Sequence, residues 1–92
     1  MHDWTLLSVE FEWNEARITL NFRNPYSETV SVVAEGVTSL NMPKKDEWGR
    51  SVSVNRINGP TILTGGISQF AVEMQSGDVI EVLARSFCLP KI

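Results

Sequence analysis

Apolar and polar residues alternate with a period of two along much of this chain. In residues 7–13 the apolar set is Leu7, Val9, Phe11 and Trp13, and serine and glutamate stand between them. Residues 17–23 repeat the pattern with isoleucine, leucine and phenylalanine. This period is typical of a β-strand with one buried face. Because only residues 14–16 separate the two runs, the sequence predicts a β-hairpin here.

The next elements are bounded by turn residues. Residues 24–28, Asn-Pro-Tyr-Ser-Glu, predict a turn, and residues 29–34 predict a third strand. Gly36 is interpreted as a bulge or bend within a longer strand that continues to Met42. Residues 43–50 are mostly polar and predict a loop, and residues 51–57 alternate again. Asn58-Gly59-Pro60 then predicts a turn.

Residues 67–75 fit two templates. Ile67, Phe70, Ala71 and Met74 match the spacing of a helix, whereas the alternation of residues 70–75 matches a strand. We favour the strand, because the turn residues 76–78 lead at once into the apolar run 79–83, as in a tight hairpin. The last strand is expected to end before Leu89.

Together these patterns predict an all-β fold in a single domain, residues 1–92. We expect six or seven short, mainly antiparallel strands in a sandwich or barrel-like sheet. A sandwich is preferred. One open sheet that dimerises through its apolar face remains an alternative.

Composition narrows the function classes. The net charge is −3, the basic residues are scattered, and the apolar content is 42%. Phosphate binding depends on clustered Lys and Arg, so we expect no nucleic-acid partner. The apolar runs are far shorter than the roughly 20 residues of a membrane span, so no membrane association is expected. The first residues lack the basic and apolar regions of a secretion signal.

Cysteine and histidine are scarce. Cys88 is the single cysteine and His2 the single histidine. No intrachain disulfide is possible, which is typical of the cytoplasm. A structural zinc site requires several such ligands, so we expect no metal and no cofactor. Ser51 lacks both a plausible base and a Gly-x-Ser-x-Gly motif. The sequence therefore favours a non-enzymatic role without excluding activity.

Two acidic candidates have competing interpretations. His2 and Asp3 could form an acid–base pair, but neighbours on an extended chain point to opposite faces, so a simple chain end is favoured. Glu73 and Asp78 flank a predicted turn and could bind a cation or act as acid and base. The favoured alternative is turn chemistry, in which Gly77 supplies a positive φ and the side chain of Asp78 or Ser76 bonds to the turn backbone.

Aromatic residues supply the remaining candidates. Trp48 precedes Arg50, Ser53 and Asn55, and a tryptophan beside polar side chains can stack on a ring or anchor a partner. The competing interpretation folds Trp48 over the open end of the core. Most of the other tryptophan and phenylalanine residues fit the core-facing side of their strands. Trp4 and Trp13 fall at strand ends and are candidates for the rim of the core. The full set is Trp4, Phe11, Trp13, Phe22, Phe70 and Phe87.

Three strings together resemble a known group of proteins. They are His2-Asp3-Trp4 before the first alternating run, Trp-Gly-Arg-Ser-Val-Ser-Val-Asn at residues 48–55, and Glu-Met-Gln-Ser-Gly-Asp at residues 73–78. The combination resembles small bacterial proteins of the immunity type, encoded near polymorphic or contact-dependent toxins. Similar sequences are expected to have proline at the position of Arg50. The resemblance implies a β fold, the bacterial cytoplasm and toxin neutralisation.

The leading hypothesis is a non-enzymatic protein-interaction module with a protein partner. The predicted interaction residues are Asp46, Glu47, Trp48, Arg50, Ser53, Asn55, Glu73 and Asp78. A related prediction is an acidic face for a basic toxin, formed by Glu28, Glu35, Asp46 and Glu47 if they cluster. One alternative is a ligand-binding or catalytic pocket around Trp48, Ser53, Asn55, Glu73 and Asp78. Another is an obligate homodimer.

Overall fold

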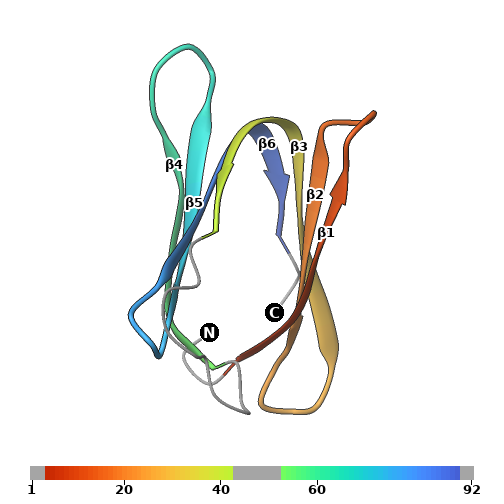
Figure 1. The fold of residues 1–92 in the computed structure, drawn as a ribbon, viewed down its shortest axis with the longest axis vertical. Coiled ribbons are helices and arrows are strands. Elements are labelled where there is room, and N and C mark those ends of the chain that lie inside the picture. Colours follow the sequence, from red (N-terminus) through yellow and green to blue (C-terminus); the bar gives the residue numbers. More distant parts are fainter. Residues whose placement is uncertain (1–3, 43–52, 90–92) are drawn as a thin grey trace.

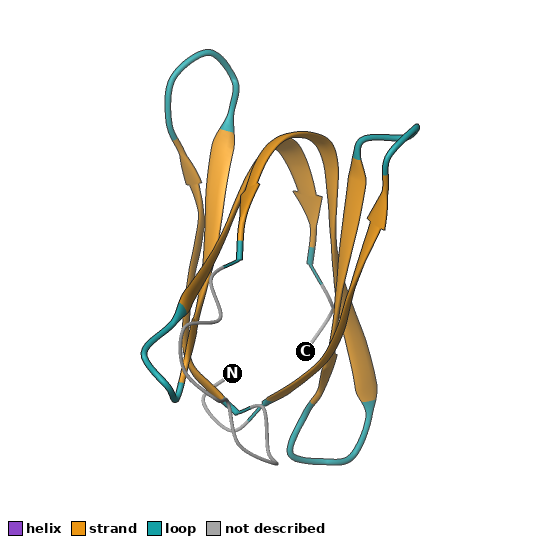
Figure 2. Ribbon diagram, in the orientation of Figure 1, coloured by secondary structure: helices purple, strands orange, loops and turns teal. Residues whose placement is uncertain are grey.

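The described part of the chain is built from strands and turns. The computed structural model describes residues 4–42 and 53–89. Within these ranges there is no helix (Figure 2), and thus none that could cross a membrane. The strands are β1 (Thr5–Glu12), β2 (Arg17–Arg23), β3 (Thr29–Asn41), β4 (Val54–Ile62), β5 (Ser68–Met74) and β6 (Val79–Cys88). The all-β prediction is confirmed, and residues 68–74 are a strand.

All six strands belong to one antiparallel sheet, in the order β1-β2-β3-β6-β5-β4. The two central strands, β3 and β6, are the longest, with 13 and 10 residues. Both arch over the top of the molecule in Figure 1. The arch divides the sheet into a first half, around β1 and β2, and a second half, around β4 and β5. The predicted sandwich is therefore formed by one continuous sheet that folds over itself.

The bend of β3 lies at Gly36. Its φ of +66° is in the left-handed region, which favours glycine, and the β3–β6 register shifts just afterwards, between Val37 and Ser39. The Val37 amide donates to the Ala16 carbonyl at 2.9 Å, just beyond the last β2–β3 pair, Arg17 with Glu35. The predicted bulge or bend at Gly36 is confirmed. A bulge increases local twist and redirects a strand, which is how the sheet turns here.

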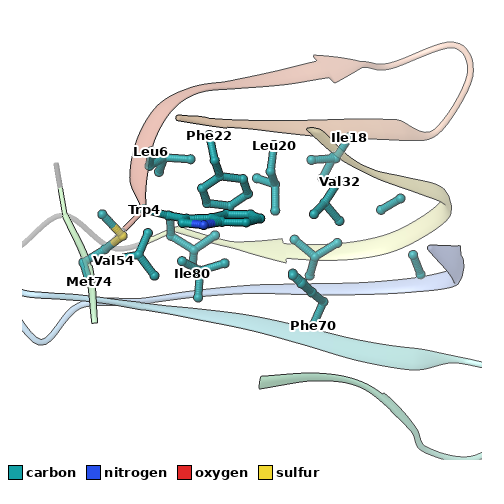
Figure 3. Packing of buried hydrophobic residues seen from close by; sticks show 14 residues of the cluster. Trp4, Leu6, Ile18, Leu20, Phe22, Val32, Val54, Phe70, Met74 and Ile80 are labelled. Carbon is teal, nitrogen blue, oxygen red and sulfur yellow. The ribbon is translucent and has the colours of Figure 1, made fainter. Parts of the chain in front are cut away.

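The core lies between the two halves of the folded sheet (Figure 3). Its first side comes from alternate residues of β2 and β3, and its second side from alternate residues of β5 and β6. The apolar face of the sheet is thus covered within the chain. The buried residues are Trp4, Leu6, Ile18, Leu20, Phe22, Val32, Ala34, Val54, Phe70, Val72, Met74, Ile80, Val82 and Ala84.

The two edge strands meet at one end of the molecule. Thr5 forms an isolated antiparallel bridge with Ser53, and the Val54 amide donates to the Trp4 carbonyl at 2.9 Å. The Trp4 ring is 5% exposed and lies 5.5 Å from the ring of Phe22. At the opposite end the β1–β2 and β4–β5 hairpins diverge (Figure 1). The sheet is therefore fastened at one end and open at the other, and it does not close into a barrel.

The predicted first strand is wrong in its bounds and in part of its facing. The β1–β2 register shifts between Leu6 and Ser8, which inserts one extra residue. The bulge places Leu6 in the core and leaves Leu7 42% exposed. Beyond it the alternation resumes as predicted, with Val9 opposite Leu20. The predicted strand residue Trp13 lies in the turn after Glu12.

The predicted turn at Asn58-Gly59-Pro60 is also wrong, because these residues lie inside β4. The β4–β5 register shifts between Asn58 and Thr61, so the ladder continues past them. A bulge accommodates glycine and proline, which would interrupt a regular strand. The strand predicted at 51–57 begins at Val54, and residues 51–52 lie outside the described part. The tight turn between β5 and β6 is confirmed.

Candidate functional site: an aromatic groove at the open end of the sheet

A groove lies between the tip of the β1–β2 hairpin and the bend of β3. Its volume is about 470 Å³, within the range of ligand pockets. The described lining residues are Phe11, Trp13, Ala16, Val37, Thr38, Ser39 and Leu40. Most of them are apolar, and Thr38 and Ser39 add two hydroxyl groups. The lining joins segments that are more than 20 residues apart in the sequence.

Two aromatic rings in contact at a tilted angle, those of Phe11 and Trp13, form one wall of the groove. Phe11 faces the same side of the sheet as the core residue Ile18 opposite, but it lies beyond the end of the core and is 41% exposed. Trp13 follows in the turn and is 83% exposed. The two ring centroids are 5.2 Å apart with an interplanar angle of 35°. Exposed aromatic side chains of this kind are common anchors at protein interfaces.

Backbone hydrogen bonds hold the hairpin tip against the bend. The Glu15 amide donates to the Glu12 carbonyl at 3.2 Å, and the Ala16 amide donates to the Trp13 carbonyl at 3.3 Å. Ala16 has a φ of +49°, and its carbonyl accepts the bond from Val37 across the groove floor. The backbone of the hairpin tip is therefore tied to the bend of β3.

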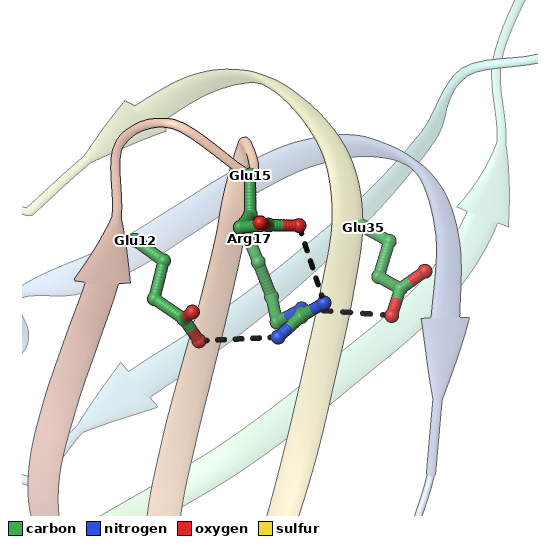
Figure 4. Close-up of polar contacts among 4 residues, drawn as sticks. All are labelled: Glu12, Glu15, Arg17 and Glu35. Atoms are coloured by element: carbon green, nitrogen blue, oxygen red, sulfur yellow. Dashed lines mark hydrogen bonds and ion pairs between the residues drawn. The ribbon is translucent and has the colours of Figure 1, made fainter.

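Three glutamates surround Arg17 on the outer face of β1, β2 and β3, opposite to the face that carries Phe11 (Figure 4). Arg17 of β2 is approached by Glu12 at 3.3 Å, by Glu15 at 3.7 Å and by Glu35 at 3.6 Å. Only the contact with Glu12 is short enough for a hydrogen bond. The Arg17 Nε atom is buried and has no hydrogen-bond partner. Glu12 and Arg17 are directly opposite each other across β1 and β2, so this contact is a cross-strand charge pair.

The rest of this outer face is structural. The Asn21 amide group donates to Glu10 at 2.7 Å and to Ser8 at 2.9 Å, and it accepts from the Ser31 hydroxyl at 2.6 Å. The Glu10 carboxylate is thus held by the amide of Asn21. These bonds connect β1, β2 and β3 side by side and stabilise the register of the first half.

The predicted interaction residues converge only in part. The Asn55 amide donates to Glu73 at 2.8 Å, and Arg56 lies 3.9 Å from the same carboxylate. The Ser53 carbonyl accepts from the Gln75 amide at 2.9 Å. These contacts join β4 to β5 at the end of the molecule opposite to the groove. Asp46, Glu47, Trp48 and Arg50 lie outside the described residues.

Asp78 does not join Glu73, so the predicted acid pair is not formed. Glu73 lies on the outer face of the sheet, whereas Asp78 follows the inward alternation of Ile80 and is 8% exposed. Its amide donates to the Ser76 hydroxyl at 3.3 Å, and that hydroxyl donates to an Asp78 carboxylate oxygen at 3.2 Å. Gly77 has a φ of +96°. The interpretation of this segment as turn chemistry is therefore confirmed.

Two of the four residues predicted to form an acidic face, Glu28 and Glu35, do not lie together. Glu28 comes just before β3 and Glu35 lies within it, so about 23 Å of extended chain separates them. The other two, Asp46 and Glu47, lie outside the described residues. The Glu28 amide donates to the Asn24 side chain at 2.9 Å, and the Glu28 carboxylate accepts from the same side chain at 3.2 Å, which stabilises the β2–β3 turn. In the described ranges no group of three metal-ligating side chains could hold an ion.

The groove itself was not predicted. Phe11 was assigned to the core and Trp13 to a strand end. Alternation predicts the face of the sheet on which a side chain lies, but it does not predict whether the opposite half of the sheet extends far enough to bury that side chain. The available signal was the position of Trp13 next to a predicted turn, where a large apolar side chain is often left without cover.

No protein-family model matches the chain, and neither the curated proteins nor the solved structures give a significant match. The functional argument therefore starts from the groove and its surroundings. The immunity-type resemblance stays a prediction.

Proposed function

We propose that this chain is a non-enzymatic protein-interaction module that binds a partner protein through the aromatic groove. The observation that carries the proposal is Trp13, which lines the groove, is 83% exposed and has its ring centroid 5.2 Å from that of Phe11. Tryptophan is among the residues most enriched at binding hot spots. Exposing such a ring is unfavourable in water, and a partner that covers it gains the free energy of burying it.

The chemistry of the groove favours binding over catalysis. None of its described lining residues has an ionisable side chain, so a general acid or base is missing from the wall. The Thr38 hydroxyl donates to the Leu83 carbonyl at 3.3 Å, which gives this side chain a structural partner. Apolar walls with a few hydroxyl groups at the rim are suited to an inserted side chain.

The nature of the partner is part of the proposal. The resemblance to immunity-type proteins favours a bacterial toxin as the partner and the bacterial cytoplasm as the compartment. Neutralisation would then act by occlusion, in which the module covers a functional surface of the toxin. This mechanism requires a tight interface and no chemistry in the module itself.

The proposal is tested with three tagged forms of the full chain used as baits in a bacterial lysate. They are the wild type, Trp13→Ala and Tyr26→Ala. Tyr26 is a matched control because it is also 83% exposed but lies in the β2–β3 turn, away from the groove. We expect Trp13→Ala to reduce recovery of a specific protein at least about tenfold, as a hot-spot truncation does.

Tyr26→Ala should retain that protein at the wild-type level, and circular dichroism should show all three baits folded. If every protein retained by the wild type is retained equally by Trp13→Ala, docking at the groove is wrong.

A further inference from the structure

We infer that the segment bound in the groove is an extended strand of the partner protein, which adds to the free edge of β3 over residues 37–41. This inference rests on the proposed function and adds the conformation and the chemistry of the bound segment. In this mode of recognition, backbone hydrogen bonds provide affinity and alternate side chains enter pockets. The inference is carried by the unpaired edge, by the residues along it and by the wall that Phe11 and Trp13 form opposite.

The second part of β3 is paired on one side only. β2 pairs with β3 as far as Glu35, whereas β6 pairs with β3 as far as Asn41. The Val37 amide still bonds to the hairpin tip, at the Ala16 carbonyl. Beyond Val37, no described strand pairs with β3 on the side of β2. Because an extended strand directs the N–H and C=O groups of alternate residues to each side, part of this backbone edge is open to a partner strand.

This edge is less protected than the two outer edges of the sheet, which belong to β1 and β4. β1 carries the charged side chains of Glu10 and Glu12 and has a bulge, and β4 contains Pro60 and two register shifts. Charges, proline and bulges are features that keep edge strands from pairing with other chains. Residues 37–41, Val-Thr-Ser-Leu-Asn, contain neither charge nor proline, and their register shift lies on the side of β6.

The groove is placed to receive the inward side chains of an added strand. Val37 and Leu40 lie opposite buried residues of β6, so both face the interior, where they are partly buried against the core. The Phe11 and Trp13 wall lies across the groove from them, and about 470 Å³ separates the two sides. An added strand would continue the sheet and point every second side chain into this space. The bound segment should therefore have apolar residues at alternate positions.

The test uses linear peptides of about ten residues, long enough to span this edge. They are selected by phage display on the full chain, and peptides that also bind the variant Trp13→Ala are removed. The best peptide is then synthesised in two modified forms, one N-methylated at its odd-numbered residues and the other at its even-numbered residues. Each form loses the N–H donors of one edge of a strand and retains all side chains.

We expect one N-methylated form to bind at least about tenfold more weakly than the unmodified peptide, because several hydrogen bonds are lost, and the other form to bind within about threefold of it. Amide hydrogen exchange of the ¹⁵N-labelled chain supplies the second measurement. Within residues 38–41, the amides that face the free side should exchange at least about tenfold more slowly when the unmodified peptide is bound. The amides of β1, which is also an edge strand, should be unaffected and serve as the control.

A selected peptide that binds equally well in both N-methylated forms, or that leaves exchange at residues 38–41 unchanged, would overturn strand addition and leave the proposed function standing. Slower exchange at these residues when the free chain is concentrated, without any peptide, would assign the edge to a second copy and overturn the inference as well. If no selected peptide requires Trp13, the inference is wrong, and the lysate comparison of Trp13→Ala with Tyr26→Ala decides the proposed function independently.

Discussion

Replacing Trp4 with alanine is expected to lower the free energy of unfolding by about 3–5 kcal/mol. Trp4 is 5% exposed, packs against Phe22, and lies where the two edge strands meet. Its removal leaves a large cavity at the only described link between β1 and β4. A domain of this length is stable by about 5–14 kcal/mol, so the loss is a large share of the total. Urea unfolding followed by circular dichroism measures it.

Trp13→Ala is the matched control, because it makes the same chemical change at a side chain that is 83% exposed. Its free energy of unfolding should stay within about 0.5 kcal/mol of the wild type. Equal losses in the two variants would mean that Trp4 is not part of the core, and the fastened end of the sheet would have to be described differently.

The second large effect is expected at Gly59, where alanine should destabilise the domain by about 2–4 kcal/mol. Gly59 has a φ of +98°, which a residue with a Cβ adopts only under strain. An added Cβ would also overlap the backbone carbonyl oxygen of Gln69 on β5. Because that oxygen belongs to the backbone, relief requires the two strands to move apart. Thermal or chemical denaturation reports the change.

Gly77→Ala separates the two causes of this effect. Gly77 has a nearly identical φ of +96°, but a Cβ added there would meet nothing within 4 Å. Gly77→Ala should therefore lower the free energy of unfolding only through backbone strain, by about 1–2 kcal/mol, which is clearly less than the loss expected for Gly59→Ala. A Gly77→Ala variant as unstable as Gly59→Ala would remove the close approach of β4 and β5 as the reason.

The strands predicted best from sequence are those with regular ladders. β2 alternates without interruption, and Ile18, Leu20 and Phe22 are all buried as expected. β5 and the beginning of β6 behave in the same way. The errors fall at bulges, because one inserted residue changes the facing of its neighbours without changing the composition of the strand. This is why Leu7 was assigned to the core, and why the bulge at Gly59 was interpreted as a turn.

The overall arrangement was only partly accessible from sequence. Gly36 indicated a bend in β3, and the structure has one. The pairing of β3 with β6 brings together strands that are about 50 residues apart, and a local pattern contains no information about it. The folding of one sheet over itself follows from that pairing.

The candidate site shows the same limit. Asn55 and Glu73 were both among the predicted site residues, but the hydrogen bond between them joins two strands and stabilises the sheet. The groove depends on where the tip of the β1–β2 hairpin lies relative to Val37 and Leu40. That position is set by the tertiary structure and cannot be inferred from a local sequence pattern. An exposed tryptophan beside a turn was therefore visible in the sequence, although its surroundings were not.

The most direct test of docking at the groove is site-specific photo-crosslinking in cells. A benzophenone side chain replaces Thr38, which is exposed in the groove and leaves Trp13 intact, or Tyr26 as the distant control. Docking at the groove predicts a discrete cross-linked protein from position 38 that is missing from position 26 and is lost when Trp13→Ala is added. The same products from both positions, or no product from position 38, would contradict it.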